Sequence, residues 1–359
     1  MAVKQTIPTE QIGSIPRSEE LVEAYRKFEA GEVSAEVLDE IGKQETITVM
    51  KALEETGSPV ISDGEQRKFS GFASYCLHGA DNIAPNGVEV FFSDGHSRIL
   101  PSLSSPPLHY VRSADEFLQF SLKQTKLPVK QSVISPSMLS LFYPSEGFKD
   151  YSNGQMIEDI ISQHVGEVRR CLDIGAYKVQ LDFTEGRLSV KLDPSGGLLS
   201  SFVALINKGM SQFDEQERLK LGVHTCPGSD LDSTHSADVD YKYLLPTLFK
   251  INVGNFYIAM ASEKESRPTL RLIKQLIEPH QRVFIGVIDP MLDAVETPEQ
   301  VRDRVLEAAD FIPLDQLGTT DDCGFSPFCD DLTTSRELAL NKIRSRIQGT
   351  KLAEEILLS

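Results

Sequence analysis

Residues 178–183 (KVQLDF) and residues 219–225 (LKLGVHT) are two short apolar runs of strand length. The longer amphipathic stretch 198–208 lies between them. A strand, a helix and a second strand in this order are typical of a βα unit with parallel strands. This alternation of strand and helix is the pattern on which the predicted fold depends.

The same alternation recurs from one end of the sequence to the other. The predicted strands are 11–15, 59–63, 129–135, 178–183, 219–225, 255–261, 282–289 and 311–317. The predicted helices are 18–56 with a break near Gly31, 153–172, 198–208, 241–249, 268–277, 298–309 and 333–358. Eight strands, each followed by a helix, predict an α/β fold, namely a single (β/α)₈ TIM barrel over residues 1–359.

The pattern is weakest between residues 72 and 126, where glycine, proline and serine punctuate the sequence. Within this stretch, Asp94 and Gly95 separate the apolar runs 87–92 and 97–100. An Asp-Gly pair between two such runs indicates a β-hairpin. Because the stretch is small, we interpret it as an insertion after the second strand.

Composition and charge exclude several classes of protein. Hydrophobic residues make up 40% of the 359 residues and charged residues 25%, which is typical of a globular chain. The 36 basic and 53 acidic residues give a net charge of −17, which argues against partners such as nucleic acid or an anionic membrane. No apolar run is long enough to span a bilayer, and the first residues do not read as a signal peptide. The odd count of 5 cysteines favours a reducing compartment, so we expect a cytoplasmic protein.

Reactive residue types cluster where the predicted strands end. Active sites of TIM barrels lie at the carboxyl ends of the strands. The residues at or just after these ends are Ser14, Asp63, Glu65, Asp182, Glu185, His224, Cys226, Asp289 and Cys323. The sequence therefore predicts one site assembled from many loops.

The most informative motif is His224-Thr225-Cys226, followed by a predicted bend at Pro227 and Gly228. Side chains alternate along a strand, so His224 and Cys226 point to the same face. Imidazole and thiolate together suit Zn²⁺. Cys323 follows the last strand and would complete a His/Cys/Cys set, with Cys329 as a competitor. The alternative is a buried thiol beside a hydrogen-bonded imidazole.

Taken together, the motifs resemble the catalytic half of cobalamin-independent methionine synthase, a zinc-containing (β/α)₈ barrel. The matching motifs, in order, are 11–17 (QIGSIPR), 63–65 (DGE), 181–182 (LD), 224–226 (HTC) and 322–324 (DCG). The resemblance implies Zn²⁺ as the cofactor, with His224, Cys226 and Cys323 as its ligands. It also implies that Ser14, Glu65 and Asp182 bind homocysteine. The implied activity is S-methyl transfer from an alkyl donor to the zinc-bound thiolate, between two small-molecule substrates.

Two departures from the family separate this chain from the methionine synthases. Ala259 stands where the family has a glutamate ligand, and Glu263 is displaced from that position, which leaves three protein ligands and an open position. The family histidine after the seventh strand is missing, which puts methyltetrahydrofolate in doubt as the donor. Asp289 remains there as a candidate catalytic acid or orienting group.

Two neighbouring segments offer further candidates. The loop 228–240 is rich in aspartate and contains His235, which we interpret as a fourth ligand, a proton donor or part of an ordinary turn. Arg67 and Lys68 follow Glu65 and would hold an anionic group or serve as rim cations.

Two alternatives to methyl transfer stay open. The first is the joining of a thiol to a different electrophile, as in the epoxyalkane–coenzyme M transferases, which resemble this family. The second is a paralogue that binds zinc or a thiol without catalysis. The sequence does not indicate the oligomeric state.

Overall fold

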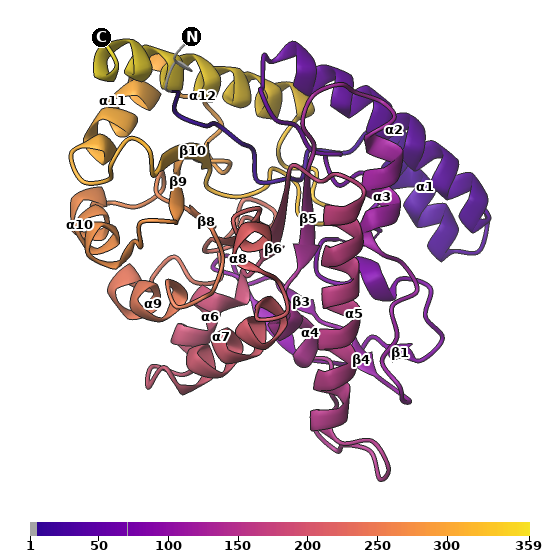
Figure 1. Ribbon diagram of the computed structural model, residues 1–359. Coiled ribbons are helices and arrows are strands. Elements are labelled where there is room, and N and C mark those ends of the chain that lie inside the picture. The colour runs from indigo at the N-terminus through magenta and orange to yellow at the C-terminus, as the bar shows by residue number, and fades with distance from the viewer. Residues whose placement is uncertain (1–5, 70) are drawn as a thin grey trace.

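A computed structural model describes residues 6–69 and 71–359 and has a parallel six-stranded sheet at its centre, with helices around it (Figure 1). Hydrogen-bonded neighbours run in the order β10, β9, β8, β7, β6, β5. The strand bounds are β5 (Lys130–Ile134), β6 (Lys178–Asp182), β7 (Leu221–Thr225), β8 (Asn255–Ile258), β9 (Arg282–Ile288) and β10 (Leu317–Asp321). Five of the eight predicted strands thus lie within one or a few residues of their expected positions.

Neither 11–15 nor 59–63 forms a regular strand, and the sheet edges are joined there by single bridges, one from Ile61 and one from Thr9, which precedes the first predicted strand. Thr9 bridges Thr319 of β10, and Ile61 bridges Val129 next to β5, both in parallel. The two segments approach each other through a hydrogen bond from the Ile15 N–H to the Gly64 carbonyl, at 3.0 Å. Prolines 8, 16 and 59 lack the N–H that a longer ladder needs. The predicted α/β fold with a parallel sheet is confirmed, whereas the regular ladder has six strands instead of a closed ring of eight.

The predicted eighth strand, 311–317, was wrongly positioned. Phe311 and Ile312 donate their N–H groups to the carbonyl of Ala308, so they end the preceding helix. The strand is β10, which begins only at Leu317 and contains polar residues that are fully buried. Its Thr319 hydroxyl lies 2.8 Å from that of Thr350. A polar strand stabilised by distant partners has no apolar signature in the sequence.

The helices follow the predicted order. The long stretch 18–56 is two helices, α1 (Glu19–Glu29) and α2 (Ala35–Glu55), and the break comes at Gly31, whose φ is +72°. The other helices are α3 (Ala114–Ser121), α4 (Pro136–Ser140), α5 (Asn153–Asp173), α6 (Glu185–Leu192), α7 (Gly197–Met210), α8 (Glu215–Arg218), α9 (Tyr241–Leu248), α10 (Ser266–Leu276), α11 (Pro298–Ala309) and α12 (Arg336–Leu357). In the described part of the chain, none of them has the length and apolarity that a membrane crossing requires.

The segment between the second edge strand and β5 contains the predicted hairpin. Strand β2 (Glu89–Phe91) pairs antiparallel with β3 (Ser97–Ile99), and the short strands β1 (Ile83–Ala84) and β4 (Ser102–Leu103) pair beneath it. The turn of the hairpin contacts the loop after β7, where the Ser93 N–H donates to the Thr234 carbonyl at 2.6 Å. A segment far away in the sequence therefore covers the carboxyl end of the sheet.

The register of the sheet determines which residues meet at that end. Asp182 at the end of β6 is the register partner of His224 near the end of β7. At the opposite end, Glu10 pairs with Lys178 at 2.7 Å and accepts a hydrogen bond from the Tyr257 hydroxyl at 2.6 Å. This buried network fills the amino end of the sheet, so the carboxyl end is where a site can form.

Candidate metal centre

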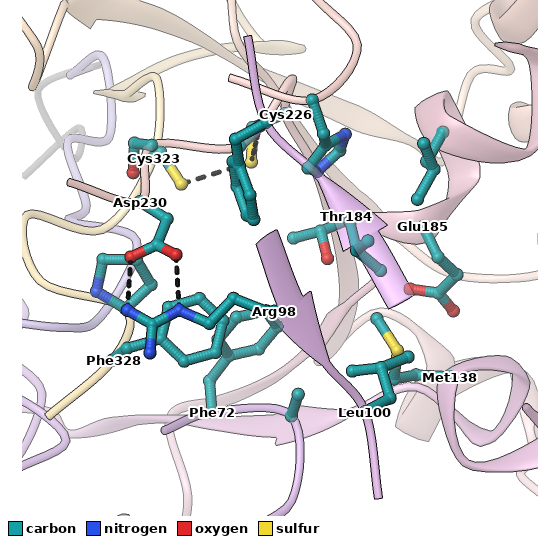
Figure 2. Close-up of a pocket in the computed structure, with 18 residues that line it drawn as sticks. Phe72, Arg98, Leu100, Met138, Thr184, Glu185, Cys226, Asp230, Cys323 and Phe328 are labelled. Carbon is teal, nitrogen blue, oxygen red and sulfur yellow. Dashed lines mark hydrogen bonds and ion pairs between the residues drawn. The ribbon is translucent and has the colours of Figure 1, made fainter. Parts of the chain in front are cut away.

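His224, Cys226 and Cys323 come together at the carboxyl ends of β7 and β10. One ligand atom of each lies within 4.8 Å of the others, and among the described residues no other His, Cys, Asp or Glu joins the group. The two sulfur atoms are 3.2 Å apart, and neither cysteine forms a disulfide (Figure 2). The exposed fractions are 1% for His224, 0% for Cys226 and 7% for Cys323. Two residues from one strand end and one from a loop 97 positions later thus form a compact buried group.

The chemistry of this donor set fits a borderline-soft divalent metal. Within residues 6–69 and 71–359, neither Nδ1 nor Nε2 of His224 has a hydrogen-bond partner, although both are buried. The hydrogen bond from Cys226 lowers the pKa of the Cys323 thiol, and His224 lowers it further. The same bond, together with burial, raises the pKa of Cys226. The pair thus has one thiol of lowered pKa beside an imidazole without a hydrogen-bond partner, a donor set that fits Zn²⁺.

Ser14, from the first of the loops at this end, fixes the position of the Cys323 loop. The Ser14 carbonyl accepts a hydrogen bond from the Phe325 N–H at 3.0 Å, and the Ser14 hydroxyl accepts one from the Ser326 N–H at 3.2 Å. Gly324 lies so close that a Cβ there would be 2.1 Å from the Ser14 hydroxyl oxygen. The motif around residues 11–17 therefore supports the cysteine loop as well as facing the site.

The carboxylate of Asp322 anchors the other side of the loop. It accepts hydrogen bonds from the backbone N–H groups of Met260, Ala261 and Ser262, at 2.7 to 2.8 Å. These residues follow β8, so Asp322 ties the Cys323 loop to the end of that strand. The sequence motif gave no sign of this contact, because Asp322 bonds to backbone groups that any residue would supply.

Ala259 lies directly beside the two thiols. It packs with Cys226 and Cys323 in a small buried cluster. Glu263, the nearest acidic residue in sequence, forms an ion pair with Arg187 at 2.8 Å instead. The position where the family has a carboxylate therefore faces the group, and in this chain it carries only a methyl group.

The predicted substrate residues meet in a polar cavity next to this group. Its lining includes Ser14, Glu65, Asp182, His224 and Cys323. The backbone of Glu65 has a φ of 58°, which is strained for a residue with a side chain. Its carboxylate also lies so close to Gly13 that a Cβ there would be 2.6 Å away. A strained turn and a glycine contact thus direct the Glu65 carboxylate toward the cavity.

Lys68 determines the charge of the polar cavity. Its ammonium lies 3.1 Å from the Glu65 carboxylate and donates to the Ser132 hydroxyl at 2.8 Å, with none of the lysine exposed. Burial raises the pKa of Asp182 to about 6, against the influence of Lys68 and with that of Glu65. When Asp182 is ionised, two carboxylates and one ammonium leave one net negative charge. That charge suits a single substrate ammonium.

Arg67 and Lys68 have different surroundings although they are adjacent. Arg67 pairs with Asp39 at 2.7 Å and lies 5.1 Å from the centre of the Phe117 ring, which is outside the cavity. From the sequence alone, both cations were candidates for holding an anionic group or for serving as rim cations. Of the two, only Lys68 contacts a site residue, and Arg67 pairs outside the cavity, as the alternative of an ordinary structural cation predicts.

A second, mainly apolar cavity adjoins the polar cavity at Cys323, and we call it the apolar chamber (Figure 2). Cys226 and Cys323 form part of its wall, and its volume is about 60 Å³. A groove of about 310 Å³ shares five of its lining residues. The residues common to the chamber and the groove are Val90, Phe92, Glu185, Leu188 and His235.

Arg98 of the hairpin closes one wall of this chamber. Its guanidinium forms two hydrogen bonds to the Asp230 carboxylate, at 2.6 and 3.0 Å, and lies 4.3 Å from the centre of the Phe328 ring (Figure 2). Asp230 belongs to the loop after Cys226. The sequence predicted the hairpin but not its place in the site, because nothing local connects residues 132 positions apart.

The remaining candidates lie at different distances from the centre. The Asp289 carboxylate accepts the Met291 N–H at 3.0 Å and is outside the described linings of both cavities, so its catalytic role stays a prediction. His235 lines the apolar chamber without joining the ligand group. Cys329 is half-buried against a separate cluster that contains Leu21 and Phe69.

Comparison with known proteins confirms the resemblance to methionine synthases. No protein-family model matches the chain. A methionine synthase from Sulfurisphaera tokodaii is 25% identical over 355 residues, which cover 98% of this chain and 94% of that protein. An uncharacterized Bacillus subtilis protein, YxjH, is 26% identical over 348 residues, with 90% and 88% covered. The solved structure of a B12-independent methionine synthase from Shewanella sp. W3-18-1 shares the fold, with a TM-score of 0.78 at 19% identity, and covers 98% of this chain and 99% of that one.

Proposed function

We propose that this chain is a methyltransferase that moves an alkyl group, in the first place methyl, onto the thiol of an amino acid such as homocysteine. The observation that carries the proposal is the buried group of His224, Cys226 and Cys323 between a polar and an apolar cavity. Relatives that match the chain over nearly its whole length are named methionine synthase.

We infer that the metal is Zn²⁺ and that these three residues would hold it. The unpartnered imidazole and the closely spaced thiols support this choice. When bound, zinc holds a substrate thiol as its thiolate at neutral pH. Because Ala259 has no carboxylate to offer, the protein supplies three ligands and leaves a position for the substrate.

The polar cavity supplies the acceptor site in this proposal. Glu65 and Asp182 bind and orient the ammonium of the amino acid, and Lys68 keeps Glu65 ionised and in place. The hydroxyl of Ser14 accepts the Ser326 N–H, which leaves its own hydrogen for the substrate carboxylate. These groups place the acceptor sulfur next to Cys323.

The apolar chamber supplies the site for the alkyl donor. It shares Phe72, Thr184, Cys323 and Pro327 with the polar cavity, so the two substrates would meet at this wall. Aromatic and aliphatic walls exclude water from the transferred group. The eight extended segments would then act as one (β/α)₈ barrel domain over residues 1–359, with the segment 72–126 as an insertion that covers its mouth.

A second candidate is transfer of the thiol to a different electrophile, as in epoxyalkane–coenzyme M transferases. Two observations favour it, the methyl group at Ala259 and the position of Asp289 outside both cavities. The carboxylates at Glu65 and Asp182 favour the amino-acid acceptor instead, since a sulfonate thiol such as coenzyme M carries no ammonium.

X-ray absorption at the zinc edge, with and without homocysteine, tests the proposal. We expect about one zinc per chain and one additional sulfur neighbour when homocysteine is added. An additional sulfur with coenzyme M but not with homocysteine would favour the second candidate. Retention of zinc with no response to any thiol, and no product with a panel of methyl donors, would indicate a paralogue without catalysis.

A further inference from the structure

His235 is buried in the wall between the apolar chamber and the groove that leads to it. It is 7% exposed and lines both cavities. Its backbone N–H donates to the Pro227 carbonyl at 2.9 Å, and its carbonyl accepts from the Lys191 ammonium at 3.0 Å. Both ends of the backbone are therefore fixed, and the ring is held in one place.

The contacts of the ring itself are apolar. A Cβ at Gly228 would lie 2.6 Å from its Cδ2 and 2.9 Å from its Nε2, so this edge of the ring packs closely against the backbone that follows Cys226. Phe92 of the hairpin approaches edge-on, with the ring centres 5.7 Å apart. A side chain larger than glycine at position 228 would displace the imidazole. The close fit thus depends on residues from two distant segments.

The imidazole of His235 nevertheless has hydrogen-bonding capacity that the fold does not use. Its Nδ1 has no partner anywhere in the residues that the structure describes, although it is buried. Burial, with Arg187 and Lys191 nearby, lowers the pKa of His235 to about 4. The ring is therefore neutral at pH 7 and carries one N–H donor and one acceptor. A buried polar ring without a partner costs free energy unless a ligand satisfies it.

Of the other acidic groups of the chamber, only Asp230 is fully paired, because Oε2 of Glu185 also has no partner among the described residues. One oxygen of Glu185 accepts hydrogen bonds from Ser135 and Ser137, and the Asp230 carboxylate is held by Arg98. Alkyl transfer creates a need for a hydrogen-bond donor next to the alkyl donor. When the carbon leaves its donor, the leaving atom keeps the electron pair and becomes more negative. A fixed neutral imidazole can stabilise such an atom by donating a hydrogen bond.

We propose that His235 contacts the alkyl donor and donates an N–H hydrogen bond to the atom from which the alkyl group departs. The inference rests on the proposed alkyl transfer. In that reaction the sulfur–carbon bond forms and the bond from carbon to the leaving atom breaks. The thiol loses its proton on binding and the leaving group takes up one proton on release, so thiol and alkyl donor give thioether and protonated leaving group. His235 contributes the hydrogen bond and no net proton.

Ligand binding to the full-length, zinc-loaded protein tests the inference without turnover. The probes are 4-nitrophenol, whose hydroxyl mimics a leaving atom, and nitrobenzene, which has the same ring without it. We expect 4-nitrophenol to bind about tenfold more tightly, and His235→Phe to abolish this difference with little effect on nitrobenzene. His235→Asn retains an N–H donor and should restore part of the difference. Equal affinities for wild type and His235→Phe, or no binding of either probe at millimolar concentration, would overturn the inference.

Kinetics separate this inference from the proposed function. With homocysteine as acceptor, His235→Phe should lower kcat/KM about 100-fold for an aryl methyl ether, whose leaving group is an anion. The same variant should lose less than about threefold with trimethylsulfonium, because its leaving group is a neutral thioether. Zinc content and Tm should match wild type. A wild-type protein that binds the probes through His235 but methylates no thiol would contradict the proposed function and leave the binding role intact.

Discussion

The two cavities that meet at Cys323 differ most in the charged groups of their walls. Glu65 and Asp182 line the polar cavity and the buried Lys68 pairs with Glu65, so these three groups carry one net negative charge when Asp182 is ionised. The apolar chamber is lined mainly by hydrophobic and aromatic side chains; among its polar members Asp230 is paired with Arg98, His235 is neutral, and burial raises the pKa of Glu185 to about 7. Such a difference indicates that the two substrates are recognised by different means, the acceptor by charge and the donor by shape and single hydrogen bonds.

The two cavities also differ in how the chain builds them. The polar cavity comes from residues at the ends of the sheet segments, whose positions are set by register, as with Asp182 beside His224. The apolar chamber depends on the hairpin β2–β3 and the loop after β7, which Arg98 and Asp230 join. Site residues on strand ends are held more rigidly than residues on loops. We therefore expect acceptor recognition to tolerate less change than donor recognition.

The largest effect is expected from variants that remove a member of the His/Cys/Cys group that both cavities share. Cys226→Ser and His224→Ala should each reduce bound zinc to less than about a tenth of an equivalent and lower methyl transfer by about 1000-fold or more. Metal analysis of the purified variants, together with activity, is the measurement. Cys329→Ser, which changes a half-buried thiol outside the group, should keep both zinc and activity. Full zinc retention in Cys226→Ser would contradict the proposed ligand set.

The next effect should be confined to the polar cavity. Asp182→Asn removes the charge that leaves the cavity net negative, so the KM for homocysteine should rise about 100-fold. The KM for the donor should change less than about twofold, because Asp182 is absent from the described lining of the apolar chamber. Asp39→Asn is the matched control, since it removes a carboxylate that pairs with Arg67 outside the cavity. A proportional change in both KM values would show that the two cavities do not act separately.

The polar cavity was also the more predictable from sequence. His224 and Cys226 alternate at one strand end, and Ser14, Glu65 and Asp182 all lie at or just after the ends of predicted strands. The rule that parallel strands end on one side of a sheet is sufficient to bring them together. The rule could not indicate which of Arg67 and Lys68 lies next to the site, because that depends on the positive φ at Glu65. No local sequence pattern indicates that a residue other than glycine will adopt a positive φ.

The apolar chamber was not predictable in the same way. Its wall requires contacts between segments more than 100 residues apart, such as Arg98 with Asp230. Apolar residues in a hairpin also look like ordinary core residues until the tertiary structure shows what they face. The displaced strand β10 has the same cause, because its buried side chains Thr319 and Asp321 have their polar partners on the distant helix α12. Local patterns predicted the elements, whereas distant polar contacts determined the exceptions.

A pH dependence of the donor KM that the homocysteine KM does not share would show that the two cavities respond to different titrating groups. Burial raises the pKa of Glu185 to about 7, with Ser135 and Ser137 acting in the opposite direction. This carboxyl is therefore neutral below pH 7 and becomes a charge in the chamber wall above it. The KM for an uncharged donor should rise up to about tenfold between pH 6 and pH 9.

Glu185→Gln keeps the side-chain shape without titration and should make the donor KM independent of pH over this range. The KM for homocysteine, measured in the same assays, should not follow the titration of Glu185. A donor KM that stays pH-dependent in Glu185→Gln would assign the titration to another group. A fall in the wild-type donor KM as the pH rises would contradict the neutral chamber.

The smallest expected effect compares one serine from each cavity. Ser14 and Ser229 both support the Cys323 loop, the first by accepting the Ser326 N–H at 3.2 Å and the second by donating to the Gly324 carbonyl at 3.1 Å. Replacing either by alanine should lower the free energy of unfolding by about 1 kcal/mol, since each removes one buried hydrogen bond. Chemical denaturation of the zinc-loaded proteins measures this loss.

The two serines should differ in their effect on the acceptor. The Ser14 hydroxyl still has its hydrogen to donate into the polar cavity, whereas that of Ser229 is used for Gly324. Ser14→Ala should therefore raise the KM for homocysteine about fivefold, and Ser229→Ala less than about twofold. Equal KM values at equal stability would make Ser14 a support of the loop only. The acceptor site would then depend on the carboxylates of Glu65 and Asp182, and the charge of the polar cavity alone would distinguish it from the apolar chamber.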